Sequence, residues 1–106
     1  MDQTRMDLRQ RSIEKATEFI RAQRIYIEAN NPSSRKSNAE LKEVTEEYLK
    51  AAAPYEAALQ ELHQYLLAAE PSEAIASEIE RTEQLLDALD KEKRVASGLI
   101  AHQGGA

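Results

Sequence analysis

Two rows of apolar residues in the second part of the chain advance by threes and fours, the spacing of a helix that packs on another helix. The first row comprises Leu41, Val44, Tyr48, Ala52, Tyr55, Leu59, Leu62 and Leu66. The second comprises Ile75, Ile79, Thr82, Leu86, Leu89, Lys93, Ala96 and Ile100. If the chain folds back at Pro71, Leu66 meets Ile75 and Leu62 meets Ile79, and the residue numbers of successive pairs add up to one constant value, except that Val44 with Ala96 misses it by one. Two antiparallel helices require such a constant, so the pattern predicts a helical hairpin.

A third apolar stripe near the start of the chain predicts another helix. Its members are Met6, Ile13, Ala16, Ile20 and Ile27. Arg9 and Gln23 interrupt this face. Paired with the first row of the hairpin, the stripe again gives a constant sum, with Ile20 opposite Tyr48. We therefore predict that this stripe forms the seam toward the second helix, whereas Leu8, Phe19 and Tyr26 form an apolar shoulder beside it.

Turn and capping signals divide the chain at the expected places. Residues 30–36 contain Asn30 and Pro32 and predict a loop. Ser37 and Glu40 have the spacing of a capping box, which predicts a helix start at residue 38. Pro54 either kinks or breaks this helix. The apolar row keeps its phase across Pro54, which favours a kink.

These elements predict an all-α fold, an antiparallel three-helix bundle or helical hairpin with coiled-coil-like seams. The expected helices cover about residues 4–29, 38–69 and 71–100. A single helical domain would occupy residues 1–101, and residues 102–106 would form a flexible C-terminal tail. The length and the three-helix pattern are similar to those of a spectrin-type repeat, although this chain has no tryptophan to match that family's core tryptophan. The alternative is a hairpin whose first helix swaps into a second copy.

Composition and charge narrow the classes of function. The chain has 106 residues, a net charge of −5 and no cysteine, which excludes disulfides and thiolate metal sites. Residues 1–37 are net basic and residues 38–90 are strongly acidic, which disfavours general binding to nucleic acid or to anionic membranes. No apolar run has the length of a membrane span or of a secretory signal. We therefore expect a cytoplasmic protein.

The candidate chemical residues do not form a catalytic or metal-binding motif. His63 and His102 lack the partner ligands that zinc or a di-iron centre needs, and the serines lie in no nucleophile or phosphate-binding motif. We expect no enzyme activity, no cofactor, no metal and no small-molecule substrate. Lys93 falls in the hairpin seam opposite Tyr48, and we expect its ammonium group to reach solvent and bond the phenol of Tyr48.

Apolar side chains beyond those that the predicted seams use indicate a surface for a partner. The candidate partner-binding residues are Phe19, Ile25, Tyr26, Leu85, Val95 and Leu99. The alternative is that they complete the core of the bundle. The sequence thus predicts a protein–protein interaction module, namely a small adaptor, chaperone or inhibitor that presents a helical face to another protein or to itself as a homodimer. A structural coiled-coil assembly subunit is the alternative, and a nucleic-acid-binding protein that uses the basic first helix ranks below both.

Overall fold

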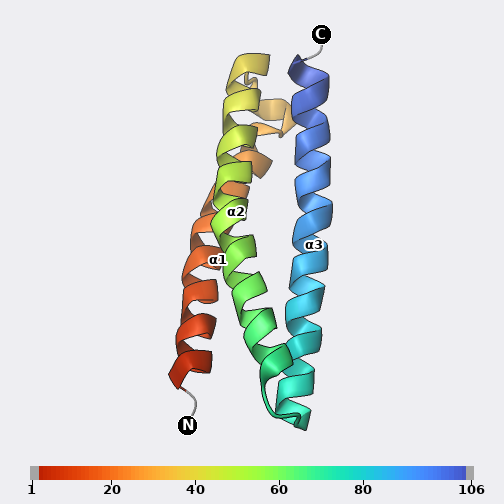
Figure 1. Cartoon of the computed structure of the whole chain (residues 1–106). Helices are drawn as coiled ribbons and strands as arrows, with labels where there is room; N and C mark the ends of the chain where they lie inside the picture. The colour runs from red at the N-terminus through yellow and green to blue at the C-terminus, as the bar shows by residue number, and fades with distance from the viewer. Residues whose placement is uncertain (1–2, 105–106) are drawn as a thin grey trace.

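The computed structural model describes residues 3–104, with side chains up to Gly98. Helix α1 spans Gln3–Ala29, the short 3-10 helix η1 spans Pro32–Ser34, α2 spans Asn38–Ala68 and α3 spans Glu73–Gly104. The three long helices lie side by side in a rod of 51 × 21 × 18 Å (Figure 1). This arrangement confirms the predicted all-α three-helix bundle.

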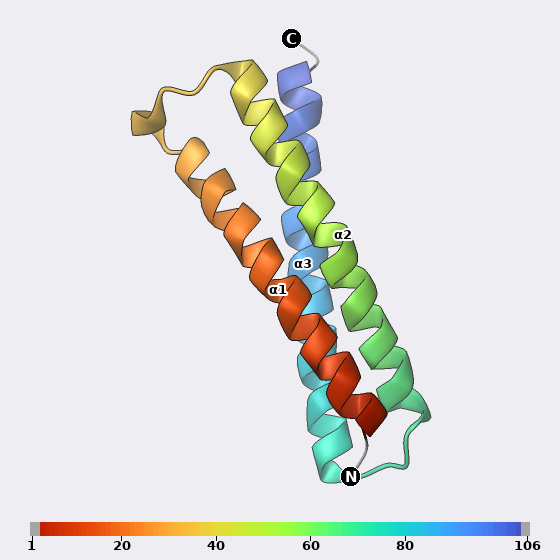
Figure 2. The same cartoon turned by 90° about the vertical axis from the view of Figure 1, so that its left-hand side faces the viewer.

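Helix α2 is the central element of the rod. It runs antiparallel to both other helices and packs along α1 on one side and along α3 on the other. Helices α1 and α3 run in the same direction and approach each other closely at only a few places in the part of the chain that is described. Figure 2 shows α1 and α2 in front, with α3 behind them. Helix α1 therefore packs within its own chain, through α2.

The predicted pairing of α2 with α3 is confirmed. Leu62, Leu66 and Ile75 belong to one buried cluster, and Ile79 packs against it. A second buried cluster contains Tyr48, Ala52, Leu59 and Leu89. The expected bond between Lys93 and Tyr48 is wrong. The Lys93 ammonium donates instead to the Glu56 carboxylate at 2.9 and 3.1 Å, because that carboxylate lies within reach of the half-buried lysine.

The predicted face of α1 is also wrong. The α1 residues that the structure buries are Leu8, Ser12, Phe19 and Ala29. In contrast, Met6, Ile13, Ile20 and Ile27, which we predicted to form the seam, are 44–60% exposed. The exposed row lies one residue further along the chain than the row of Ser12 and Phe19. Helix α1 is therefore rotated by about one residue step, roughly 100°, from the predicted orientation.

Stacked aromatic rings account for this rotation. The ring centroids of Tyr26 and Tyr48 lie 4.5 Å apart, those of Phe19 and Tyr48 lie 5.1 Å apart, and those of Phe19 and Tyr55 lie 5.3 Å apart. We call this run of four rings the aromatic ladder. Aromatic side chains bury more apolar area than any others and gain further from offset stacking. Turning Phe19 and Tyr26 toward α2 is therefore worth more than burying the neighbouring isoleucines.

The helix ends follow local sequence signals with two differences. The predicted capping box is present, because the Glu40 amide donates to the Ser37 hydroxyl at 3.2 Å and the Ser37 amide donates to the Glu40 carboxylate at 3.4 Å. Helix α2 continues through Pro54 without a break. The Ser72 hydroxyl accepts from the Ile75 amide at 3.1 Å, so Pro71 precedes α3 rather than lying in its first turn. Helix α3 also runs to Gly104, past the predicted end at residue 100.

Candidate functional site

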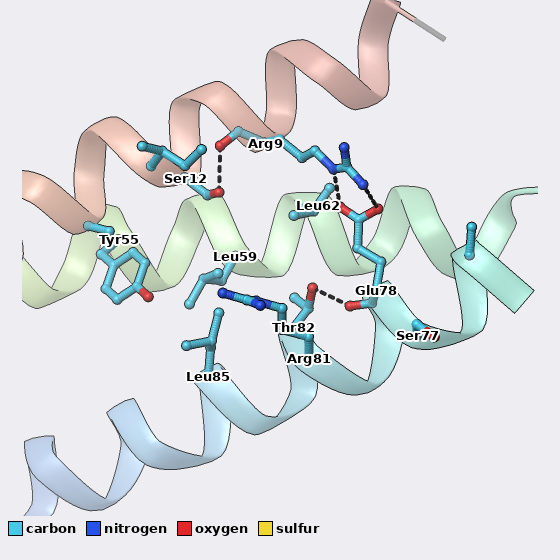
Figure 3. A pocket seen from close by; sticks show the side chains of 13 residues that line it. Arg9, Ser12, Tyr55, Leu59, Leu62, Ser77, Glu78, Arg81, Thr82 and Leu85 are labelled. Atoms are coloured by element: carbon cyan, nitrogen blue, oxygen red, sulfur yellow. Dashed lines mark hydrogen bonds and ion pairs between the residues drawn. The ribbon is translucent and has the colours of Figure 1, made fainter. Parts of the chain in front are cut away.

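An open groove of about 600 Å³ lies between α1 and α3, with α2 as its floor. It exists because both outer helices pack on α2 rather than on each other. Its α1 wall consists of Arg9, Ser12, Ile13 and Ala16, and its floor of Tyr55, Leu59 and Leu62. Its α3 wall consists of Ala74, Ser77, Glu78, Arg81, Thr82 and Leu85. We call this feature the α1/α3 groove (Figure 3).

An ion-pair cluster joins the two walls near the N-terminal end of α1. The Arg9 guanidinium donates to the two carboxylate oxygens of Glu78 at 2.6 and 2.7 Å, and Arg5 Nε donates to Glu78 at 2.8 Å. The hydrogen bond from Arg9 is the main cause that holds the pKa of Glu78 below its usual value, against the opposing effect of burial. The Glu78 carboxylate is therefore ionised and shared by two arginines.

A second polar bridge joins α1 to α3 further along the rod. The Gln23 side-chain amide lies 3.3 Å from both carboxylate oxygens of Glu92, and the Tyr48 hydroxyl donates to Glu92 at 2.9 Å. Burial first, and then the bond to Glu92, raise the pKa of the Tyr48 phenol. This bridge and the Arg9–Glu78 bridge both join residues 69 positions apart. Two bridges of equal separation fix the parallel register of α1 and α3.

An exposed apolar row follows the α1 side of the groove. It consists of Met6, Ile13, Ile20 and Ile27 at seven-residue spacing, and we call it the exposed α1 row. Ile13 lines the groove itself, and Leu85 lines the opposite wall. Two polar residues interrupt this face, Arg9 and Gln23, and both reach α3. Exposed apolar surface of this kind on a small protein is typical of an interaction surface.

Arg81 is the charged residue in the lining of the groove that has no acidic partner among the described residues. Its side chain extends along the groove toward Tyr55 in Figure 3. Its charge partly offsets the raised pKa of Tyr55, which burial causes. Within the described part of the chain, no hydrogen bond or ion pair joins the Arg81 guanidinium to another side chain. Arg5 and Arg9, in contrast, are both bonded to Glu78.

The residues that we predicted to bind a partner lie in different environments in the structure. Phe19 is 5% exposed and Tyr26 stacks on Tyr48, so both belong to the packing of α1 on α2 and are not available as an open docking face. The prediction that Phe19 and Tyr26 form an open surface for a partner is therefore corrected, because both rings belong to the aromatic ladder. Leu85 lies in the α1/α3 groove and Val95 is exposed further along α3. Leu99 lies outside the residues whose side chains are described.

Ile25 lies on a different side of α1. It lines a second depression of about 540 Å³ between α1 and α2, together with Val44. Charged residues of both signs surround this depression, namely Glu18, Arg21, Glu43, Glu47 and Lys50. The α1/α3 groove has three charged residues in its lining and borders the exposed α1 row, so it is the better candidate for an amphipathic partner helix.

The members of the exposed α1 row were missed because they were assigned to the core. Their spacing gives no signal against that assignment, because together with Arg9, Ala16 and Gln23 they advance alternately by threes and fours, as a buried seam does. A second set of positions on α1 has the same spacing and comprises Arg5, Leu8, Ser12, Lys15, Phe19, Ala22, Tyr26 and Ala29. This second set is the one that faces α2.

The described residues hold neither a metal-binding cluster nor a helix that could span a membrane. Among residues 3–104, no group of three or more acidic or histidine side chains is placed to hold a metal ion. No described helix combines the length and apolar character needed to cross a membrane. No family model, curated protein or solved structure matches this chain.

Proposed function

We propose that this chain is a non-enzymatic protein-interaction module that binds an amphipathic helix of a partner protein in the α1/α3 groove. The observation that carries the proposal is the exposed α1 row, which borders the open groove at Ile13 and has no partner helix in the described structure. An adaptor, a chaperone and an inhibitor all act by such a contact. The bound helix of the partner would be a fourth helix beside the three long helices of this chain.

The length of the exposed α1 row suits one helix. The row extends over about 21 residues, or ~32 Å, which corresponds to about three heptads of an incoming helix, and the groove occupies the part of this length between Arg9 and Ala16. That helix would rest on α1 and α3, opposite α2, and give a four-helix arrangement. Ala16 and Ala74 are small and leave room between the walls for larger side chains of the partner. Helix-in-groove recognition uses apolar anchors at such i, i+3, i+4 and i+7 positions.

The groove is formed before a partner binds. The Arg9–Glu78 and Gln23–Glu92 bridges join α1 to α3, and the aromatic ladder holds α1 against α2. A partner would therefore meet walls whose spacing is already set. Preorganisation of this kind raises affinity because less conformational entropy is lost on binding.

Site-specific photo-crosslinking tests the proposal. A photo-reactive amino acid replaces Ile20, on the exposed α1 row, or Ile25, which is comparably exposed on another side of α1. In an extract of the native host, we expect position 20 to form a discrete adduct with a different protein and position 25 to form little. The added substitution Ile13→Asp should abolish that adduct while helical circular dichroism is unchanged. Equal crosslinking from both positions would contradict the proposal.

The structural-assembly alternative uses the same row. Seven-residue spacing also suits pairing with a second copy of the chain, so a homodimer stays a prediction. This alternative predicts that adducts at Ile20 contain only this chain, and that light-scattering mass rises with protein concentration. A mass that stays at one chain, together with an adduct to a different protein, supports the interaction module.

A further inference from the structure

We infer that the helix bound in the α1/α3 groove carries an acidic side chain opposite Arg81, and that Arg81 selects it. The inference rests on the proposed function and names the chemistry of the partner. The charges in the groove support this inference. The charged residues that line the groove are Arg9, Glu78 and Arg81. Arg9 and Arg5 share the Glu78 carboxylate, which leaves no anion in the groove for Arg81.

This cationic groove belongs to an acidic protein. The whole chain has a net charge of −5, yet the lined part of the groove has more positive than negative charge. Glu92, further along the rod, is already bonded by Tyr48 and Gln23. The acidic residues of α2 and α3 therefore do not supply Arg81 with a partner inside the groove. An acidic helix would be attracted to this face and repelled by the net acidic surfaces of α2 and α3 elsewhere.

Coverage by a helix changes the energetics of Arg81. In the free protein, water solvates its guanidinium group. A bound helix would displace that water, and a covered guanidinium without an anion is strongly unfavourable. A glutamate or aspartate at this point would accept two parallel hydrogen bonds from the planar guanidinium. The groove would thus reject helices that are apolar or basic opposite Arg81, as well as favour acidic ones.

The same charges argue against a second copy as the occupant. Antiparallel pairing of the exposed α1 row with itself would place Met6 against Ile27 and Ile13 against Ile20. Helix α1 of the second copy is itself net basic, with six basic and four acidic residues, so it is not the acidic helix that Arg81 would favour. The two copies would also bring their unpaired Arg81 groups to the same interface. Like charges at an interface are unfavourable, so the charges favour an acidic helix of another protein.

Two synthetic peptides test the inference. Each contains three heptads with leucine at the first and fourth positions, and the flanking positions are glutamate in one peptide and lysine in the other. Binding is followed by NMR of isoleucine methyl groups in the full-length protein. We expect the glutamate peptide to shift Ile13 and Ile20 and the lysine peptide to leave them unchanged. Arg81→Gln should weaken binding of the glutamate peptide about tenfold, and Arg81→Glu should reverse the preference between the peptides.

Arg94 provides the matched control. It lies on α3 outside the groove, 79% exposed and paired with Asp90. Arg94→Glu makes the same change in net charge and should leave the preference unchanged. Equal binding of both peptides would overturn the inference while leaving the proposed function standing. Absence of binding by either peptide, or self-association of the protein in their place, would overturn both.

Discussion

Helix α1 carries two apolar rows side by side, and the structure treats them in opposite ways. Leu8, Phe19 and Tyr26 turn toward α2, where Phe19 is 5% exposed. The exposed α1 row has isoleucines that are 50–60% exposed. Both rows are apolar, so hydrophobicity alone does not decide which is buried. The decisive difference is that the first row meets the rings of Tyr48 and Tyr55 on α2, whereas the second faces the gap toward α3.

The two apolar rows of helix α1 are expected to serve different purposes, one in stability and the other in binding. The buried row should determine whether the bundle folds. The exposed α1 row should determine what the folded bundle binds. Substitutions in the two rows are therefore expected to have different consequences, although the rows differ by a single residue step.

The largest expected effect is that of Phe19→Ala. It removes the ring that contacts both Tyr48 and Tyr55, and we expect a loss of about 3–5 kcal/mol in the free energy of unfolding. Ile20→Ala removes a half-exposed side chain and should cost below ~1 kcal/mol. Urea unfolding followed by circular dichroism measures both. A larger loss from Ile20→Ala would mean that the exposed α1 row is the true seam.

A smaller effect is expected from Tyr48→Phe, which keeps the ring in the aromatic ladder. The change removes the hydroxyl of the buried Tyr48, which donates to the charged Glu92 carboxylate at 2.9 Å. We expect a loss of about 1–2 kcal/mol in urea unfolding. Tyr26→Phe is the control, since within the described residues the hydroxyl of Tyr26 has no hydrogen bond. Equal losses from the two variants would show that the Glu92 bond contributes nothing.

Low pH should weaken the ion-pair cluster of Arg5, Arg9 and Glu78 at the end of the groove. The folded-state pKa of Glu78 is depressed by Arg9 and Arg5, so its contribution to stability is complete above the unfolded-state pKa, near ~4.3. The contribution is lost as the pH falls through the lower folded-state pKa. The stability difference between the natural chain and Glu78→Gln should therefore be larger at pH 7 and shrink below about pH 4. A difference that is independent of pH would contradict this account.

The smallest effect is expected at the exposed ion pair between α1 and α2. Arg11 and Glu61 lie 2.8 Å apart, but their side chains are 53% and 55% exposed. Solvent screening makes such pairs weak, so Arg11→Gln should change the free energy of unfolding by less than ~0.5 kcal/mol. The same urea titrations provide the measurement. A loss comparable to that of Phe19→Ala would mean that charge rather than ring packing holds α1 to α2.

The sequence was sufficient for the hairpin and insufficient for the rotation of α1. The rows of α2 and α3 each have one dominant apolar face, so pairs such as Leu62 with Ile79 could be predicted from spacing. Helix α1 has two competing faces, and Ser12 and Lys15 interrupt the one that is buried. Ring stacking against α2 resolves that competition. It depends on three-dimensional contacts that a count of apolar residues does not contain.

The candidate site was predictable only in part. Leu85 was recognised as surplus apolar surface, and it lines the groove. Ile13 and Ile20 were not, because the α1 rotation decides whether they face α2 or solvent. Arg81 carried no sequence signal. Its importance follows from the pairing of Arg5 and Arg9 with Glu78, which links residues far apart in the chain.

The most direct test is solvent exposure of individual isoleucine methyl groups, measured by NMR with a soluble paramagnetic agent. In the free protein, we predict strong relaxation of Ile13, Ile20 and Ile25 and weak relaxation of the buried Ile75. After addition of the glutamate peptide, Ile13 and Ile20 should become shielded while Ile25 stays exposed. Shielding of Ile13 and Ile20 in the free monomer, or protection of Ile25 in their place, would contradict the account.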